Sequence, residues 1–194
     1  EEKNAYLVIE RFIGHIDLSL EEAKAGILRA GRYVADLRVL GGVDGESPEP
    51  VPLQAALSRA LVRVESDLGK ELVGCVRIEE SVHAMSLVGQ VAMLAVALAT
   101  WLKHALMRSG NSTVIRLVPS QDPTGNYVWL DATIDDEHEF RKEYTEDISS
   151  RDLVMGLLAR HGADWRERVG ADGRVSAIGI RMPSSEHAWL QLSD

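Results

Sequence analysis

The chain has 194 residues, of which 45% are hydrophobic, and its formal net charge at pH 7 is -9. That hydrophobic fraction can bury a core, so we expect one ordinary domain or two small ones rather than a disordered chain. The acidic balance argues against a nucleic-acid binder, because binding phosphates needs clustered Lys and Arg. Cys75 is the only cysteine, which excludes an internal disulfide and favours a reducing, cytoplasmic location.

Residues 2–37 predict two helices, because apolar residues recur there at spacings of three and four, as in the seam of a helical bundle. The seam residues are Ala5, Ile9, Phe12 and Ile16, followed by Leu20, Ala23, Ile27, Ala30, Val34 and Leu37. Ser19 followed by Glu22 is a capping-box signature, so we expect the second helix to begin there. A short turn requires antiparallel helices, so residues 1–41 are predicted to form a helical hairpin.

A hairpin of two helices leaves apolar surface that it cannot cover by itself. Two hairpins that associate into a four-helix bundle would bury this surface, so we expect a homodimer. The residues expected at the dimer contact are Ile9, Phe12, Ile16, Leu20, Ile27, Val34 and Leu37.

Residues 41–50 are rich in glycine and proline and predict a linker, after which residues 50–194 predict a second domain that mixes helices and strands. A polar, mostly acidic segment follows the strand at 127–134. The expected elements are a helix at 52–68, a strand at 72–78, a helix at 87–107, strands at 113–118 and 127–134, the acidic segment at 135–147, a helix at 150–161 and a strand at 174–182.

The stretch from Met85 to Leu102 contains no charged side chain and is long enough to span a bilayer. It is rich in alanine, which contributes little to membrane transfer, and Lys103 and His104 follow it directly. We therefore expect a buried helix of the second domain and no membrane insertion.

This order of elements resembles the core of the bacterial histidine kinases. Glu21–Arg38 resembles the second hairpin helix of that family, Pro50–Leu53 the connector, residues 90–107 the asparagine-bearing helix, and residues 175–183 the closing strand. The resemblance implies an α+β fold: an antiparallel helical hairpin, which forms a four-helix bundle in the dimer, followed by a Bergerat-like α/β sandwich of the GHKL ATPase type.

The positions that the resemblance assigns to nucleotide binding are altered. The family's two asparagines, which coordinate Mg²⁺ and the phosphates, correspond to Ala97 and Trp101, and neither side chain can ligate a cation. The family's Asp-x-Gly-x-Gly motif corresponds to Asp135 and the residues after it, where no glycine follows. The glycine-rich turn before the last helix corresponds to Ser150 and its neighbours, again without glycine. We therefore expect no ATP-dependent kinase activity and no cofactor.

The acidic run at 135–139 could hold a divalent metal through its carboxylates and His138. Adjacent residues rarely all face one centre, so we prefer a solvated remnant of the nucleotide lid and expect no metal site.

The resemblance places the phosphoacceptor histidine near the start of the first hairpin helix, at or just before Glu1. If a histidine precedes Glu1 in the native protein, the expected activity is histidine phosphotransfer; if none does, the expected role is that of a pseudokinase scaffold. His15 is the only histidine of the predicted hairpin, but it lies beside the turn.

The resemblance also implies a partner, the receiver domain of a response regulator. We expect it to dock on Ile13, Lys24, Leu28 and Arg32, because Leu28 lies off the seam and Lys24 and Arg32 flank it at four residues on either side. Two other functions stay open: an active but divergent ATP-dependent histidine kinase, and a GHKL-like module that sequesters a different protein.

Overall fold

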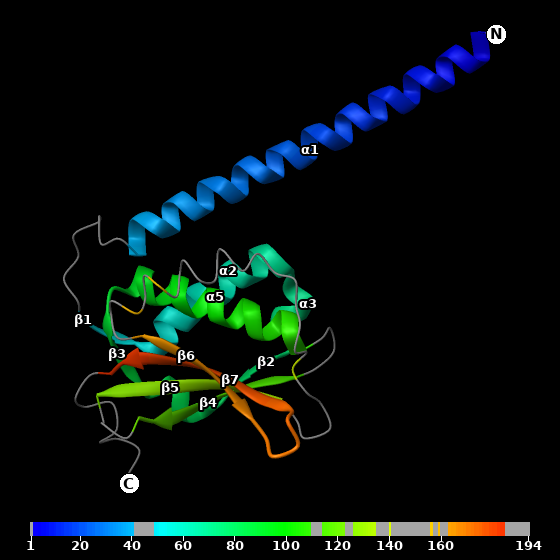
Figure 1. Ribbon diagram of the computed structural model, residues 1–194. Helices are drawn as coiled ribbons and strands as arrows, with labels where there is room; N and C mark the ends of the chain where they lie inside the picture. Colours follow the sequence, from blue (N-terminus) through cyan, green and yellow to red (C-terminus); the bar gives the residue numbers. More distant parts are fainter. Residues whose placement is uncertain are drawn as a thin grey trace. The chain divides into compact units, whose positions relative to one another are not determined.

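The computed structural model describes residues 2–40, 49–109, 114–122, 126–134 and 163–184, together with Phe140, Gly156 and Ala159. The chain divides into two compact units, Glu1–Arg38 and Val39–Asp194. The first unit is a single helix and the second is an α/β sandwich (Figure 1). Residues 41–48 of the linker predicted at 41–50, the acidic segment at 135–139 and 141–147, and most of the predicted helix at 150–161 lie outside the described residues, whereas the last two linker residues belong to a strand at Glu49–Pro52.

The first unit is one continuous helix, α1 (Glu2–Leu40). The turn predicted within residues 15–19 is therefore wrong, although the α+β class is confirmed. Residues 15–25 contain neither proline nor glycine, and every further residue of an established helix adds a hydrogen bond. Ser19 and Glu22 form a capping box only where the backbone leaves the helix, and here both lie inside it.

The second unit contains a five-stranded sheet with the order β2-β4-β5-β7-β6. The strands β2 and β4 run parallel, and the other neighbours run antiparallel. The strands of this sheet are β2 (Val76–Ile78), β4 (Ile115–Gln121), β5 (Tyr127–Thr133), β6 (Asp164–Val169) and β7 (Val175–Pro183). A separate antiparallel pair is formed by β1 (Glu49–Pro52) and β3 (Ser86–Gly89).

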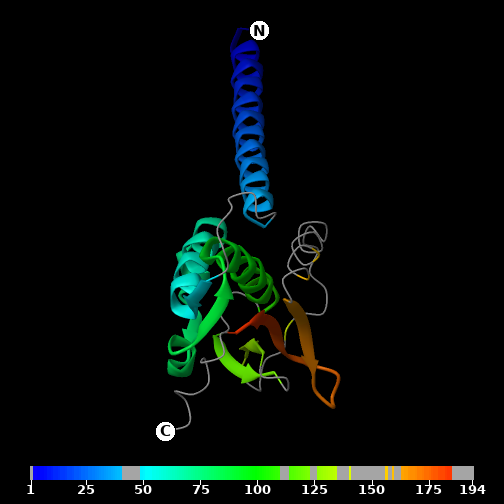
Figure 2. The same cartoon turned by 90° about the vertical axis from the view of Figure 1, so that its left-hand side faces the viewer.

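Two long helices, α2 (Leu53–Leu68) and α5 (Val91–Ser109), lie side by side over one face of the sheet in both Figure 1 and Figure 2. The alternation of β5 points Val128, Leu130 and Ala132 to the helices, and all three are buried. Helix α5 is the one described helix that is long and apolar enough to cross a membrane, and 72% of its most apolar stretch is buried within the fold.

Two further predicted elements differ from the observed ones. The segment predicted as a strand at 72–78 begins as a short helix, α3 (Lys70–Val73), and only its end forms β2. Gly74 ends this helix by donating its backbone N–H to the Lys70 carbonyl at 2.9 Å. The helix predicted from residue 87 begins at Val91, because residues 86–89 pair with β1 as β3; a four-residue helix, α4 (Glu80–His83), precedes that strand.

Candidate functional site

The inner side of α5 is where the resemblance places a nucleotide. Ala97 is 1% exposed and Trp101 is completely buried. The Trp101 indole Nε1 donates a hydrogen bond to the backbone carbonyl of Ile178 on β7 at 3.1 Å. The indole therefore occupies the space between the helix and the middle of the sheet, and its single polar atom is satisfied there.

One turn further along α5 begins a polar group that we call the α5–β6 cluster: His104, Arg108, Trp165 and Glu167. Arg108 forms an ion pair with Glu167, in which its Nη1 bonds Oε1 and its Nη2 lies 3.4 Å from Oε2. His104 Nε2 lies 3.4 Å from Arg108 Nη1, and the His104 ring meets the Trp165 ring edge-on at a centroid distance of 4.9 Å.

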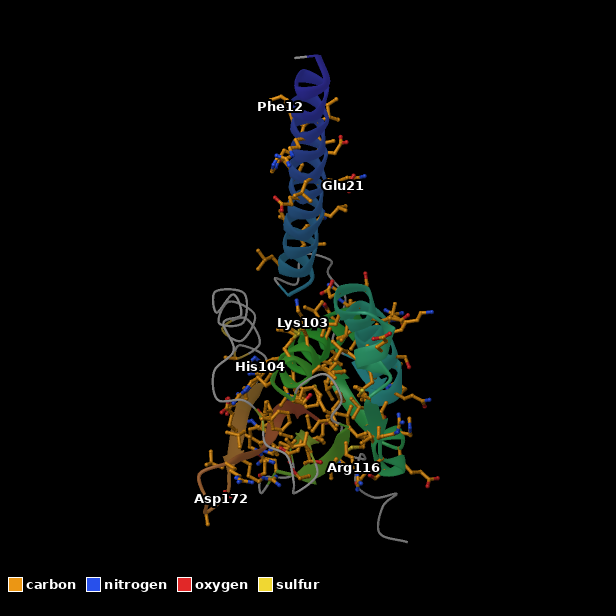
Figure 3. All side chains as sticks on the ribbon, turned by 90° about the vertical axis from the view of Figure 1, so that its right-hand side faces the viewer. Phe12, Glu21, Lys103, His104, Arg116 and Asp172 are labelled. Atoms are coloured by element: carbon orange, nitrogen blue, oxygen red, sulfur yellow. The ribbon has the colours of Figure 1, made fainter. Side chains whose placement is uncertain are left out.

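The alternation of β6 explains how this cluster forms. Trp165 and Glu167 lie two residues apart, so both point to the helix side of the sheet, where His104 and Arg108 lie one helical turn apart on α5. Lys103, the residue next to His104, instead pairs with Asp67 of α2 at 3.7 Å. Figure 3 labels these two consecutive α5 residues.

The electrostatics of the cluster favour a structural role. Arg108 is almost fully buried, and a buried guanidinium is stable only when it is paired with a carboxylate and hydrogen-bonded. It also lies in the last turn of α5, where a cation interacts favourably with the helix dipole. Since Glu167 already neutralises this cation, the cluster joins β6 to α5 and does not offer an open phosphate site.

The other predicted nucleotide positions, Asp135 and Ser150, lie outside the described residues. His15 is exposed on α1, and His83 is exposed at the end of α4. Among the residues that the structure describes, no group of three or more His, Cys, Asp and Glu side chains could hold a metal ion.

The predicted docking residues Ile13, Lys24 and Leu28 are exposed on α1, and Lys24 lies 3.5 Å from Glu21. The side chain of Arg32 is outside the described part of the helix, as is that of Ile9. The remaining predicted dimer residues are all exposed in the single chain: Phe12, Ile16, Leu20, Ile27, Val34 and Leu37.

A depression of about 400 Å³ opens between α2 and α5. It lies between the two helices, and neither Ala97 nor Trp101, the α5 positions that the resemblance assigns to Mg²⁺ ligands, lines it. The residues that line it are Ser58, Arg59, Val62, Arg63, Ala92, Ala95 and Val96.

The sequence analysis missed the α5–β6 cluster and a second polar group around Asp131. Asp131 is buried at the centre of β5 and accepts hydrogen bonds from Arg166 and Arg168 at 2.8 Å. A signal for both groups was present in Asp164–Val169, because four of its six residues are charged, which is unusual for a strand.

No protein family model matches the chain, and no curated protein matches it. Solved structures of similar fold exist. The Acinetobacter baumannii histidine kinase AdeS superposes with a TM-score of 0.50 at 14% identity, over 78% of this chain and 77% of that one. The mycobacterial sensor histidine kinase MprB gives 0.49 at 17% identity, over 70% of this chain and 98% of that one.

A third structure, the cytoplasmic segment of the histidine kinase QseC, gives a TM-score of 0.48 at 17% identity, over 83% of this chain and 95% of that one. At such low sequence identity, a superposition shows only that the backbones are arranged in a similar way. Apart from the hairpin, in whose place α1 is a single helix, the fold expected from the order of the elements is confirmed, and the chain has a histidine-kinase-like fold.

Proposed function

We propose that the chain is a two-component signalling protein that dimerises through α1 and docks the receiver domain of a response regulator without binding ATP. The observation that carries the proposal is Trp101, which lies where the resemblance places a Mg²⁺-ligating asparagine and packs completely into the core. The fold supports a role in two-component signalling, and the buried indole argues against the ATP-dependent step.

The packing on α5 supports the loss of nucleotide binding. A nucleotide bound there needs oxygen ligands for Mg²⁺ and space for three phosphates. Ala97 supplies no ligand, and the Trp101 indole bonds the sheet at Ile178. The nearest buried cation, Arg108, is already paired with Glu167.

We expect no saturable binding of Mg-ATP at millimolar concentration in a calorimetric titration. The physical reason is that no described side chain near Trp101 replaces the lost phosphate and metal contacts. A histidine kinase with an intact pocket, titrated under the same conditions, is the positive control. Saturable, Mg²⁺-dependent binding by this chain would contradict the proposal and favour a divergent active kinase.

The exposed surface of α1 supports both dimerisation and docking. Its seam residues, among them Ile27 at 73% exposed, leave apolar surface that a single helix cannot cover. Because α1 is one helix, we propose that two copies of α1 pair directly, as in a coiled coil. Leu28 is 61% exposed and lies beside that seam, so it stays available for a partner.

We expect receiver domains of the host to be retained by the unmutated chain and lost with Leu28→Asp, measured by pull-down. The added charge would be unpaired in an apolar contact, which is costly. Val62→Asp is the matched control, because Val62 is a similarly exposed apolar residue on α2 and should leave binding unchanged. Retention of no receiver, or equal retention by Leu28→Asp, would contradict the docking face.

The enzymatic part of the role depends on the residues that precede Glu1 in the native protein. With a histidine there, the dimer would pass a phosphoryl group between receivers. Without one, it would act as a scaffold that occupies the receiver. Incubation of the full native chain with a phosphorylated receiver, followed by detection of phosphohistidine, separates these two roles.

A further inference from the structure

The face of the sheet turned away from α2 and α5 carries five arginines, which we call the arginine face: Arg77, Arg116, Arg166, Arg168 and Arg181. The register places them on one side, because residues directly opposite each other share a face. Arg77 lies opposite Arg116, and Arg181 lies opposite both Trp129 and Asp164. In Figure 3, Arg116 lies on the side of the sheet away from Lys103 and His104.

Buried carboxylates hold part of this face in place. Asp131, whose side chain is 3% exposed, bonds Nη2 of Arg166 and of Arg168, each at 2.8 Å. Ser120 donates to the same carboxylate at 3.1 Å. Arg181 pairs with the buried Asp122 at 3.8 Å. The buried carboxylates of these acids therefore hold the arginine side chains in place, with the guanidinium groups at the surface of the sheet.

A glycine and two aromatic rings complete the arrangement. A Cβ atom on Gly179 would lie 2.3 Å from Asp131 Oδ1, so only glycine leaves room for the carboxylate. The Arg166 guanidinium stacks on the Trp129 ring at 3.9 Å, and that of Arg181 lies 4.8 Å from the centroid of the Tyr127 ring. Side chains held in this way lose little further freedom when a ligand binds.

The arginine face carries positive charge, whereas the whole chain has a negative net charge. Arg77, Arg116 and Arg168 are exposed, whereas Asp122 and Asp131, which pair with arginines of this face, are buried. On a chain of net charge -9, such a local cationic patch attracts acidic groups and orients them at this face.

We propose that the arginine face binds an extended, acidic polypeptide segment, an interaction beyond the proposed receiver docking on α1. Arg166 and Arg168 lie two residues apart on β6, and Nη2 of each bonds the same Asp131 oxygen. Carboxylates at alternate positions of an extended peptide lie on one side of it, where they can face the arginines, and guanidinium groups bind carboxylates through paired hydrogen bonds. The Arg166–Asp131 contact already uses that chemistry.

A polypeptide fits this face better than a nucleic acid. Binding of single-stranded nucleic acid without base pairing depends on exposed aromatic rings on which bases stack. Trp129 is only 8% exposed, and Arg166 already covers its ring.

The test is fluorescence anisotropy with a labelled peptide of alternating Glu and Thr residues, titrated with the full chain at low salt. We expect saturable binding that weakens at least about tenfold in the double variant Arg77→Glu/Arg116→Glu and in Arg168→Glu, because each replaces attraction by repulsion. The matched control, Arg59→Glu/Arg63→Glu on α2, makes the same charge change on the helix layer and should leave the affinity within about twofold.

Circular dichroism shows whether each variant folds. Arg168→Glu places a carboxylate near Asp131, so the Arg77→Glu/Arg116→Glu pair decides the outcome if that single variant unfolds. Three results would overturn the proposal: no binding of the peptide, an equal loss of affinity in the α2 control, and binding of single-stranded RNA or of phosphatidylserine vesicles in place of the peptide.

Discussion

Trp101 shows at the scale of one residue how the structure uses a position that the resemblance assigns to an Mg²⁺ ligand: the side chain is part of the core. Its indole reaches from α5 to β7 and bonds the Ile178 carbonyl, so the ring contributes both apolar burial and one buried hydrogen bond. Ala97, one turn earlier on α5, is small and buried, which lets the helix pack closely. Both features stabilise the fold, and neither side chain contains an oxygen atom that could ligate Mg²⁺.

We expect Trp101→Ala to lower the free energy of unfolding by about 3–5 kcal/mol, because it creates a cavity and leaves the Ile178 carbonyl without its partner. Urea denaturation followed by circular dichroism measures this change. Trp101→Phe is the control: it keeps most of the ring and loses only the hydrogen bond, so its effect should be clearly smaller. A loss below about 1 kcal/mol for Trp101→Ala would show that the indole is not part of the core.

At the scale of an element, α1 has a clear apolar pattern in its sequence, but the single chain does not bury the residues of that pattern. From Ile16 to Leu37 its apolar residues keep alternating spacings of four and three, which is the heptad pattern of a coiled coil. In the single chain these residues are exposed. A long helix of this kind is stabilised when another helix covers its seam.

We expect Ile27→Asp to convert the dimer to monomer, because it would bury an unpaired charge in the seam at a cost of several kcal/mol, on the order of 3–5. Light scattering with mass determination measures the change. Leu28→Asp is the matched control, since it introduces the same charge one residue outside the seam and should leave the dimer intact. A monomeric mass for the unmutated chain would exclude pairing through α1.

At the scale of the whole molecule, the two units differ in what stabilises them. Every residue of the buried hydrophobic core, from Val51 to Met182, belongs to the α/β unit. The α/β unit therefore contains its own core, whereas α1 contributes no described residue to it. We therefore expect the α/β unit to be stable by itself and α1 to depend on a partner.

We expect residues 49–194, expressed alone, to fold as a monomer with a cooperative thermal transition. The reason is that removal of α1 leaves the described core complete and removes the seam proposed to hold the dimer. Size-exclusion chromatography with light scattering gives the mass, and calorimetry gives the transition. A dimeric mass, or unfolding without a cooperative transition, would show that the second unit needs α1.

Local patterns predicted most of the elements that the structure describes. The elements predicted at 52–68, 127–134 and 174–182 correspond to Leu53–Leu68, Tyr127–Thr133 and Val175–Pro183, because each of these short stretches contains enough information by itself. The order of these elements predicted the α+β class and the histidine kinase fold. The absence of oxygen ligands at Ala97 and Trp101 was likewise visible in the residue types alone.

Tertiary structure decided what depends on partners far apart in the chain. The Arg108–Glu167 pair joins residues 59 positions apart, and the contact between Arg168 and Asp131 spans 37. Such contacts depend on the strand order and on the register of β6, which no local pattern specifies. The backbone at Ser19 was likewise not specified by the local sequence. Ser19 and its neighbours fit the interior of a helix as well as an N-cap, and the structure shows that α1 continues through them.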